Sequence, residues 1–431
     1  MNLINEKKIS EESKKYLRIG GKWFKKAKDP INLEEKRYPI TPGMIIADEG
    51  KEIGAKILAA APKYLASTNL PSHTNFQESI MNPDGEMFFN EYHPIRHTPV
   101  EGSWQHIEKL LRHLFSGEDG EEDQYEIILD YFQLLYLKPM QKLPVILLTS
   151  RAQHTGKSTF CNFVKAIYGQ NVMAIDKARL TSQFNSAWLT KLVVFIEETQ
   201  DMTTADIEKI KTLVTALTTP SEAKGKDAIE ASTIVKVILC TNNEANPVAI
   251  DETDTRFWVR KVHPLAEDCP KQSFLEDCEK EIPAFLYFLL HRKMSTNQKD
   301  RLWFSSNQIR TKAWQKIVCY NEPKLDAELR EALIDIMNQT GEDTLMYDAV
   351  SLANLCNNLG ISNGRRGNIG RTDIKSVLSK WGLHASKNTV RFRFKWQYGA
   401  EYAIDEKEKT GKAYTITRKI IEQNSINEQD F

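Results

Sequence analysis

The order of apolar and polar positions between residues 143 and 263 predicts an alternation of buried strands and helices. Four short apolar runs have the length and continuity of strands buried on both faces: LPVILLT (143–149), LVVFIEE (192–198), IVKVILCTN (234–242) and TRFWVRKV (255–262). Helical spacing separates the strands from Lys157 to about Ala166 and from Thr204 to Leu217. Strands that alternate with helices favour a mostly parallel sheet covered on both faces, so the predicted fold class is α/β.

The flanking regions follow other patterns. Residues 1–100 mix short apolar stretches with Gly, Pro, Asn and Asp turn signals, which predicts a small α+β region. Helical spacing returns from Ser103 to Leu137 and from Phe274 to Met294, where Pro283 predicts a break or kink. Three helical stretches in the last hundred residues precede the alternating VRFRFKW (390–396), which is the pattern of a winged helix. We therefore expect an α+β region at 1–100, a helical lead-in at 101–140, the α/β core at 141–265, a helical segment at 266–325 and a winged-helix-like domain at 326–431.

Composition and charge narrow the class of protein. The 431 residues are 41% hydrophobic and 27% charged, which is ordinary for a soluble globular protein. Lys+Arg and Asp+Glu number 58 each, and this balance argues against a generally polybasic nucleic-acid binder. From Gly360 to Ile420, however, there are fourteen Lys and Arg residues and only five Asp and Glu residues. Any nucleic-acid surface is therefore local, and the C-terminal domain is where we expect it.

The sequence also argues against a membrane span, a signal peptide, a disulfide framework and a metal site. No apolar run approaches the ~20 residues of a membrane span, and the first residues lack the apolar segment of a signal peptide. The six cysteines are scattered without a CxxC pair, which argues against a disulfide framework and against zinc. His106 and His113 share a predicted helix face, but no carboxylate or cysteine completes a metal site. We interpret both as core or surface histidines and expect a reduced, cytoplasmic protein without a membrane partner.

The segment RAQHTGKST (151–159) follows the first apolar strand and precedes a helix, which is the setting of a phosphate-binding P-loop. Lys157 would reach the β- and γ-phosphates, and the hydroxyl of Ser158 would ligate Mg²⁺. Arg151 stands where such loops usually have their first glycine. The predicted cofactors are ATP and Mg²⁺, and the predicted nucleotide-binding residues are Gln153, His154, Thr155, Gly156, Lys157, Ser158 and Thr159.

Three further positions suit nucleotide hydrolysis. An apolar strand that ends in two carboxylates is typical of a Walker B motif, so Glu197 is the predicted metal-side acid and Glu198 the acid that polarises the attacking water. Asn242 ends the next strand, where it can hold that water and sense the γ-phosphate. Arg256 is a candidate arginine finger that would act on the nucleotide of a neighbouring subunit, and an ordinary surface ion pair is the alternative.

The order and spacing of these motifs resemble superfamily 3 helicases, which are AAA+-type motors, and most closely the helicase part of phage and plasmid primase-helicases. The resemblance covers residues 88 to 265, including FFNEYHP at 88–94. It implies a hexameric ring, a finger at Arg256 with Arg260 as a weaker candidate, and a channel loop that carries Lys224 and Lys226 to DNA. The sequence departs from the family at Arg151 and in having Glu197 where the family has Asp.

These observations predict an ATP-dependent DNA helicase that translocates on DNA during replication of a phage, plasmid or other mobile element, with a separate primase or polymerase as a possible partner. The C-terminal domain would contact phosphates through Lys375, Arg391, Arg393 and Lys395, while Trp381 and Trp396 are interpreted as core residues rather than base-stacking ones. An ATP-switched DNA-binding or loader protein uses the same motifs and stays open as an alternative. A small-molecule P-loop kinase ranks third, because it needs neither the Asn-bearing strand nor Arg256.

Overall fold

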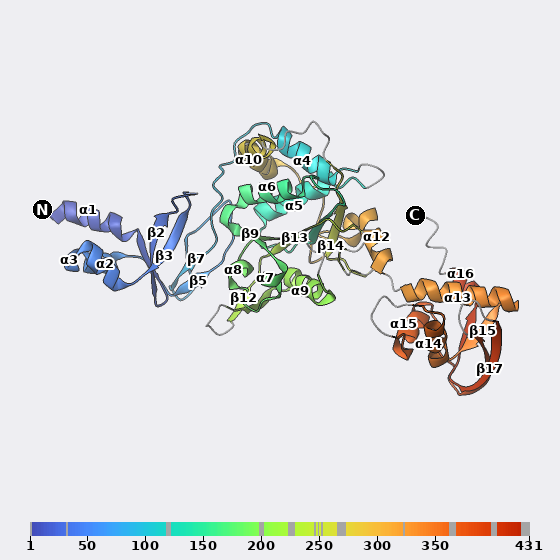
Figure 1. Cartoon of the computed structure of the whole chain (residues 1–431). Helices are drawn as coiled ribbons and strands as arrows, with labels where there is room; N and C mark the ends of the chain where they lie inside the picture. The colour runs from blue at the N-terminus through green and yellow to red at the C-terminus, as the bar shows by residue number, and fades with distance from the viewer. Residues whose placement is uncertain are drawn as a thin grey trace. The chain divides into compact units, whose positions relative to one another are not determined.

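The computed structural model describes residues 2–31, 33–117, 122–197, 202–222, 229–244, 247–248, 250, 253–264, 273–321, 324–361, 368–397 and 403–423. The chain divides into two compact units, Met1–Tyr320 and Asn321–Phe431, which Figure 1 colours from blue through yellow and from orange to red. Among the described residues, no helix combines the length and the apolar character that crossing a membrane requires.

The first ninety residues of unit 1 contain helices and two small sheets. One sheet has the order β3-β2-β1-β4 and the other the order β5-β7-β6. The strands of the two sheets are β1 (Tyr16–Ile19), β2 (Lys22–Lys28), β3 (Glu35–Ile40), β4 (Lys63–Tyr64), β5 (Ala66–Thr68), β6 (Ser79–Met81) and β7 (Met87–Asn90). The helices are α1 (Asn2–Ser13), α2 (Pro42–Glu49) and α3 (Lys51–Ala60).

A five-stranded parallel sheet forms the core of unit 1 and confirms the predicted α/β architecture. Its order is β14-β8-β13-β10-β9, and every neighbouring pair is parallel. Four strands correspond to the apolar runs of the sequence: β8 (Val145–Thr149), β10 (Val193–Glu197), β13 (Lys236–Thr241) and β14 (Phe257–Lys261). The fifth, β9 (Val172–Ile175), was not predicted because its four residues are too short a run to stand out from the helix before it.

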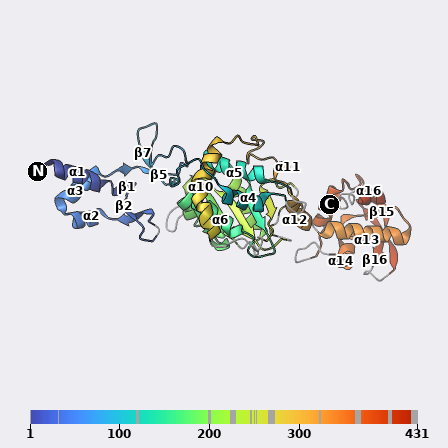
Figure 2. The same ribbon diagram turned by 90° about the horizontal axis from the view of Figure 1, so that it is seen from above.

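Helices cover both faces of this sheet, as a parallel sheet buried on both sides requires. Ile146 and Leu148 of β8 pack into one apolar cluster, and Val145 and Leu147 into the other. The helices of the first face are α4 (Gln105–Phe115), α5 (Tyr125–Leu137), α6 (Lys157–Tyr168) and α10 (Ser273–His291), which lie together in Figure 2. The helices of the second face are α7 (Lys177–Thr181), α8 (Ser186–Leu189), α9 (Thr204–Thr215) and α12 (Lys312–Asn321).

The remaining elements of unit 1 are short. The 3₁₀ helix η1 (Gly169–Asn171) follows α6, and α11 (Ser306–Ile309) precedes α12. Strands β11 (Thr218–Ser221) and β12 (Ile229–Ser232) pair antiparallel. The predicted break at Pro283 is wrong, because α10 is continuous through this residue. Phe285, Leu286 and Leu289 lie buried just beyond the proline, and this packing outweighs the backbone hydrogen bond that a proline removes.

Unit 2 encloses its own apolar core. Its elements are α13 (Lys324–Thr340), β15 (Thr344–Tyr347), α14 (Ala349–Asn358), α15 (Arg371–Lys380), β16 (Val390–Gln397), β17 (Ile404–Gly411), β18 (Tyr414–Thr417) and α16 (Arg418–Gln423). Strands β16 and β17 form an antiparallel hairpin, and β15 pairs antiparallel with β18. Trp381 is buried and its indole N–H donates to Asp326 at 2.9 Å, so its place is in the core.

Candidate nucleotide-binding site

The predicted motifs meet at the carboxyl edge of the core sheet. Strand β13 lies between β8 and β10, with Thr241 opposite Thr149 and Cys240 opposite Glu197. The P-loop follows β8, Asn242 follows β13, and Glu197 ends β10. The structure therefore brings together the loop, the amide and the carboxylate that the sequence separates by forty residues or more, at the edge where α/β sheets bind ligands.

The backbone of the P-loop is shaped to receive an anion. His154 and Gly156 both have left-handed conformations, with φ of 57° and 90°, which turn successive N–H groups toward one side. Helix α6 begins at Lys157, and its N-cap residue is Gly156, which has no side chain with which to cap the helix. The first N–H groups of a helix have no partner within it, so phosphate oxygens fit here both as hydrogen-bond acceptors and as charges at the positive end of the helix dipole.

The side chain of Lys157 points back to the strand ends. Its Nζ donates to Oδ1 of Asn242 at 2.9 Å. Burial lowers the pKa of Lys157, and within the described part of the chain no carboxylate forms an ion pair with it. A half-buried lysine whose hydrogen-bond partner is a neutral amide is well suited to accept a phosphate as its counter-ion.

Glu197 and Ser158 are the residues that fit a magnesium ion. Val193 and Phe195 of β10 pack in the cluster that contains α6, so the alternation of side chains along the strand turns Glu197 toward the same face. Glu197 and Ser158 are both exposed, which leaves their oxygens open to a hydrated cation. Glu198 lies outside the described residues. Among the described residues, no three His, Cys, Asp or Glu side chains gather as a metal cluster of their own.

Glu244 is a site residue that the sequence reasoning missed. Its Oε1 accepts a hydrogen bond from the backbone N–H of Arg151 at 2.8 Å. Its Oε2 lies 3.7 Å from Nε of Arg151 and 3.8 Å from Nζ of Lys261. Glu244 therefore anchors the first P-loop position, where glycine was expected. Its place two residues after Asn242, at the end of the same strand, was the available signal.

His113 of α4 also supports the P-loop. Its Nε2 donates to the carbonyl of Thr155 at 3.1 Å. A Cβ added at Gly156 would lie 3.7 Å from Cδ2 of His113, so ring and loop are in close contact. The interpretation of His113 as an ordinary core or surface histidine is therefore incomplete. His106 instead pairs with Glu281 of α10 at 2.6 Å.

The two candidate arginines have different surroundings. Arg260 is 2% exposed and donates to the carbonyls of Ser116 and Glu122 at 2.9 Å, as well as to that of Leu114, so its guanidinium is committed to the fold. Arg256 precedes β14, and its carbonyl accepts from Val145 at the start of β8. Because β8 and β14 run parallel, Arg256 lies at the amino edge of the sheet, opposite its own P-loop.

The β11–β12 hairpin is described only at its base. Lys224 and Lys226, the predicted channel lysines, lie outside the described residues. Asn185, just before α8, holds the end of β11: its Nδ2 donates to the carbonyl of Pro220 at 2.8 Å, and its Oδ1 accepts from the N–H of Glu222 at 2.9 Å.

The predicted DNA-contacting residues of unit 2 fall into two groups. Lys375 is exposed on α15. On the β16–β17 hairpin, Arg391 pairs with Glu408 at 2.6 Å, Arg393 with Glu406 at 3.2 Å, and Lys395 with Glu342 and Glu406 at 2.7 and 2.8 Å. The hairpin cations therefore already have carboxylate partners.

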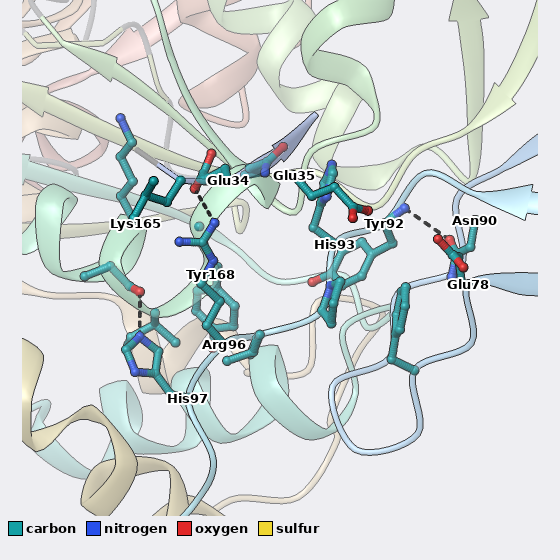
Figure 3. A pocket seen from close by; sticks show the side chains of 18 of the residues that line it. Glu34, Glu35, Glu78, Asn90, Tyr92, His93, Arg96, His97, Lys165 and Tyr168 are labelled. Carbon is teal, nitrogen blue, oxygen red and sulfur yellow. Dashed lines mark hydrogen bonds and ion pairs between the residues drawn. The ribbon is translucent and has the colours of Figure 1, made fainter. Parts of the chain in front are cut away.

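A cavity of about 620 Å³ lies near the far end of α6 and is shown in Figure 3. Its cations are largely paired: Arg96 with Glu34 at 3.2 Å, Arg37 with Glu91, and Lys26 with Glu78. Burial, aided by the charges of Lys191 and Arg37, lowers the pKa of His93 to about 4, so its imidazole is neutral. Because most of the cations that line this cavity are paired with carboxylates, we do not assign phosphate binding to it.

Comparisons with known proteins give one family match, across the core sheet, and several similar solved structures. A model for a family of unknown function (DUF5906) matches residues 148–260, from the end of β8 into β14. No curated protein matches the chain. The apo structure of the NrS-1 C-terminal region (305–718) aligns with a TM-score of 0.65 at 16% identity, over 96% of this chain and 98% of that chain. An A-form apo structure of the same region gives a TM-score of 0.56 at 19% identity, over 79% and 80% of the two chains. JCV helicase aligns with a TM-score of 0.28 at 12% identity, a similarity that supports no inference about fold or activity. The likeness to the NrS-1 region establishes a shared fold.

Proposed function

We propose that this protein is an ATP-driven DNA motor, a helicase that couples hydrolysis in an oligomeric ring to translocation on DNA. The observation that carries the proposal is the arrangement of charged and polar groups on the core sheet. Lys157, Asn242 and Glu197 gather at the carboxyl edge, while Arg256 lies at the amino edge. Within one copy, Arg256 is on the wrong side to act on the nucleotide that the same copy binds.

The residues of the carboxyl edge divide the work at the nucleotide. The N-terminus of α6 and Lys157 bind and orient the phosphates. Ser158 and Glu197 hold Mg²⁺, which neutralises charge that develops on the phosphates during hydrolysis. Asn242 is freed from Lys157 when a phosphate takes its place, and it then orients the attacking water, while Glu198 is assigned the role of polarising that water.

A neighbouring copy supplies the remaining charge. In a ring of identical subunits, each interface joins the carboxyl edge of one copy to a different face of the next. An arginine at the amino edge can then stabilise the transition state across the interface. This arrangement favours a motor over a small-molecule kinase, and we adopt the hexamer that the sequence resemblance implies.

We assign DNA contacts to Lys224 and Lys226, in the segment between β11 and β12 that lies outside the described residues, and to unit 2 as a winged-helix domain. The helices α14 and α15 followed by the β16–β17 hairpin support that classification of unit 2. We further propose replication of a phage, plasmid or other mobile element as the setting, on the motif resemblance.

The test is ATP hydrolysis with and without single-stranded DNA, comparing the parent with Lys157→Ala, Arg256→Ala and a mixture of the two. Lys165→Ala, an exposed lysine at the other end of α6, is the matched control. We expect DNA stimulation in the parent and the control, loss in each single variant, and recovery in the mixture. Normal hydrolysis by Arg256→Ala would overturn the trans arrangement. Hydrolysis that DNA stimulates without displacing a strand from forked DNA would favour the loader alternative.

A further inference from the structure

Arg256 belongs to a small network of charges at the amino edge of the core sheet. Its backbone N–H donates to Oδ1 of Asp254 at 3.0 Å, and its Nη1 lies 3.6 Å from the same oxygen. The other carboxylate oxygen of Asp254 is 2.7 Å from Nζ of Lys211. Asp254 therefore faces a cation on each side, with Lys211 held closely and the Arg256 guanidinium held at a longer distance.

Both members of the close pair are buried, and Lys211 lies on helix α9. Asp254 is 3% exposed and Lys211 is 6% exposed. Burial would lower the pKa of Lys211, but its contacts with Asp254 and Glu208 raise it above its ordinary value, so this lysine is charged. Helix α9, which carries Lys211, is fixed by a capping box at Thr203 and by buried side chains. A buried acid next to a buried lysine is tolerated only as a pair, so the position of Asp254 is set by α9.

This network orients Arg256 but does not occupy all the hydrogen-bond donors of its guanidinium. At 3.6 Å its contact with Asp254 is longer than a hydrogen bond. Its Nε is buried and has no hydrogen-bond partner among the described residues, although its side chain as a whole is 32% exposed. The exposed part of the Arg256 side chain can therefore be reached by an acceptor from another copy of the chain, whereas the buried Nε cannot.

We infer that Asp254 and Lys211 are positioning residues for Arg256. The ion pair with Lys211 fixes the carboxylate of Asp254, and this carboxylate orients the Arg256 guanidinium toward a phosphate bound by a neighbouring copy. Lys211 offsets the charge of Asp254, which keeps the arginine from closing into a tight ion pair. The inference rests on the proposed function, because it has no consequence unless Arg256 acts on a nucleotide.

The first experiment separates positioning from folding. Asp254→Asn keeps the size of the side chain but removes its charge, and Lys211→Gln/Asp254→Asn replaces the ion pair by a neutral pair that can still hydrogen-bond. We expect both to lose about 100-fold in the rate of ATP hydrolysis, the scale that follows from a small misplacement of a reacting group. Binding of a non-hydrolysable ATP analogue should stay at the parental affinity, because the P-loop is at the opposite edge. Glu208→Gln, which removes the exposed partner of Lys211, is the control and should hydrolyse ATP at the parental rate. If the pair is merely structural, the double variant will recover rate and unfolding temperature together, and the inference is wrong.

The second experiment mixes Asp254→Asn with Lys157→Ala. Asp254→Asn has an intact P-loop and a misplaced Arg256. Lys157→Ala has a defective P-loop and a correctly placed Arg256. In randomly assembled rings about a quarter of interfaces then join an intact P-loop to an intact arginine, so activity should return to about that fraction of the parent. Absence of recovery would mean that Asp254 acts on its own nucleotide site, which overturns the inference. If Arg256→Ala is fully active, the proposed function fails. If Arg256→Ala is inactive but Asp254→Asn is normal, only the positioning role fails.

Discussion

Nζ of Lys157 donates to Oδ1 of Asn242 at 2.9 Å, so the P-loop lysine and the amide at the end of the neighbouring strand are in direct contact. The two residues are 85 positions apart in sequence. A triphosphate offers Lys157 a stronger, charged acceptor than an amide oxygen. Under the proposed function, the contact would link the arrival of phosphate at the P-loop to the release of Asn242.

Substitution of Asn242 should affect hydrolysis more than binding. We expect Asn242→Ala to lower the rate constant of ATP hydrolysis by about 100-fold, the usual cost of removing one oriented polar group from a transition state. The dissociation constant of ATP should change by less than about fivefold, because the helix N-terminus and Lys157 stay in place. Steady-state hydrolysis and equilibrium binding of a labelled nucleotide measure the two quantities.

Asn243→Ala is the matched control for this prediction. Asn243 is the next amide along the chain, and it is not the partner of Lys157. If Asn243→Ala loses activity while Asn242→Ala keeps it, the assignment of the two amides is reversed.

His113 should influence nucleotide affinity although it lies outside every motif. His113→Ala removes the hydrogen bond to Thr155 and a ring that packs on Gly156. A lost hydrogen bond of about 1 kcal/mol corresponds to a roughly fivefold weaker affinity for ATP. His113→Gln can still donate to the carbonyl and should recover part of the loss, whereas Lys109→Ala, at an exposed position of the same helix, should have no effect. Equal affinity for His113→Ala and the parent would show that α4 does not support the loop.

The part of the site that sequence could predict is the part that follows from local pattern and strand direction. GKS before a helix fixes the loop, and parallel strands bring their carboxyl ends to one edge, so Asn242 and Glu197 were expected beside Lys157. His113 and Glu244 could not be predicted in this way. Their contacts with the P-loop span 42 and 93 residues, and they depend on how α4 and the segment after β13 pack against it.

In unit 2, the number of Lys and Arg residues did not reveal how their side chains are paired, for a similar reason. The excess of Lys and Arg after residue 360 is real, but a count does not show which cations are paired. The antiparallel pairing of β16 with β17 brings Arg391 to Glu408, and Arg393 and Lys395 to Glu406. Alternation alone predicted the strand, while the pairing of its charges depends on a partner strand that the pattern did not reveal.

Stability should depend on pH through a buried lysine at the amino edge of the sheet. Lys142 is 8% exposed, and its Nζ donates to the carbonyl of Thr233 at 2.6 Å. Within the described residues no carboxylate pairs with it, and burial lowers its pKa to about 8. The unfolded chain, with a lysine pKa near 10.4, binds more protons above pH 8, so this residue contributes stability that rises as pH rises toward 10.4.

Lys142→Met isolates this contribution. The variant has no charge to desolvate, so its stability relative to the parent should be greatest near pH 7.5 and should decrease by on the order of 1 kcal/mol by pH 9.5. Burial raises the pKa of the Cys278 thiol to about 12, so this group lowers the stability of the folded protein as pH rises. The thiol is present in both the variant and the parent, so its effect cancels when the two are compared. Urea unfolding at several pH values gives the free energies. A difference that does not change with pH would mean that Lys142 is not desolvated in the folded protein.

DNA binding by unit 2 should depend more on α15 than on the β16–β17 hairpin. Lys375 and Lys380 are exposed on α15, and no ion pair involves them in the described part of the chain. Arg391 must first give up Glu408, which it contacts through two hydrogen bonds of 2.6 and 2.7 Å. Each lysine that contacts a phosphate contributes about one unit to the slope of log affinity against log salt, so Lys375→Ala and Lys380→Ala should each lower that slope by about one. Arg391→Ala should leave the slope nearly unchanged. Arg391 is already paired with Glu408, so we expect it to contribute little to phosphate binding in the parent. Fluorescence anisotropy with labelled DNA at several salt concentrations measures the slopes. A larger change for Arg391→Ala than for the two lysine variants would mean that the hairpin exchanges its carboxylates for phosphates and is itself the binding surface.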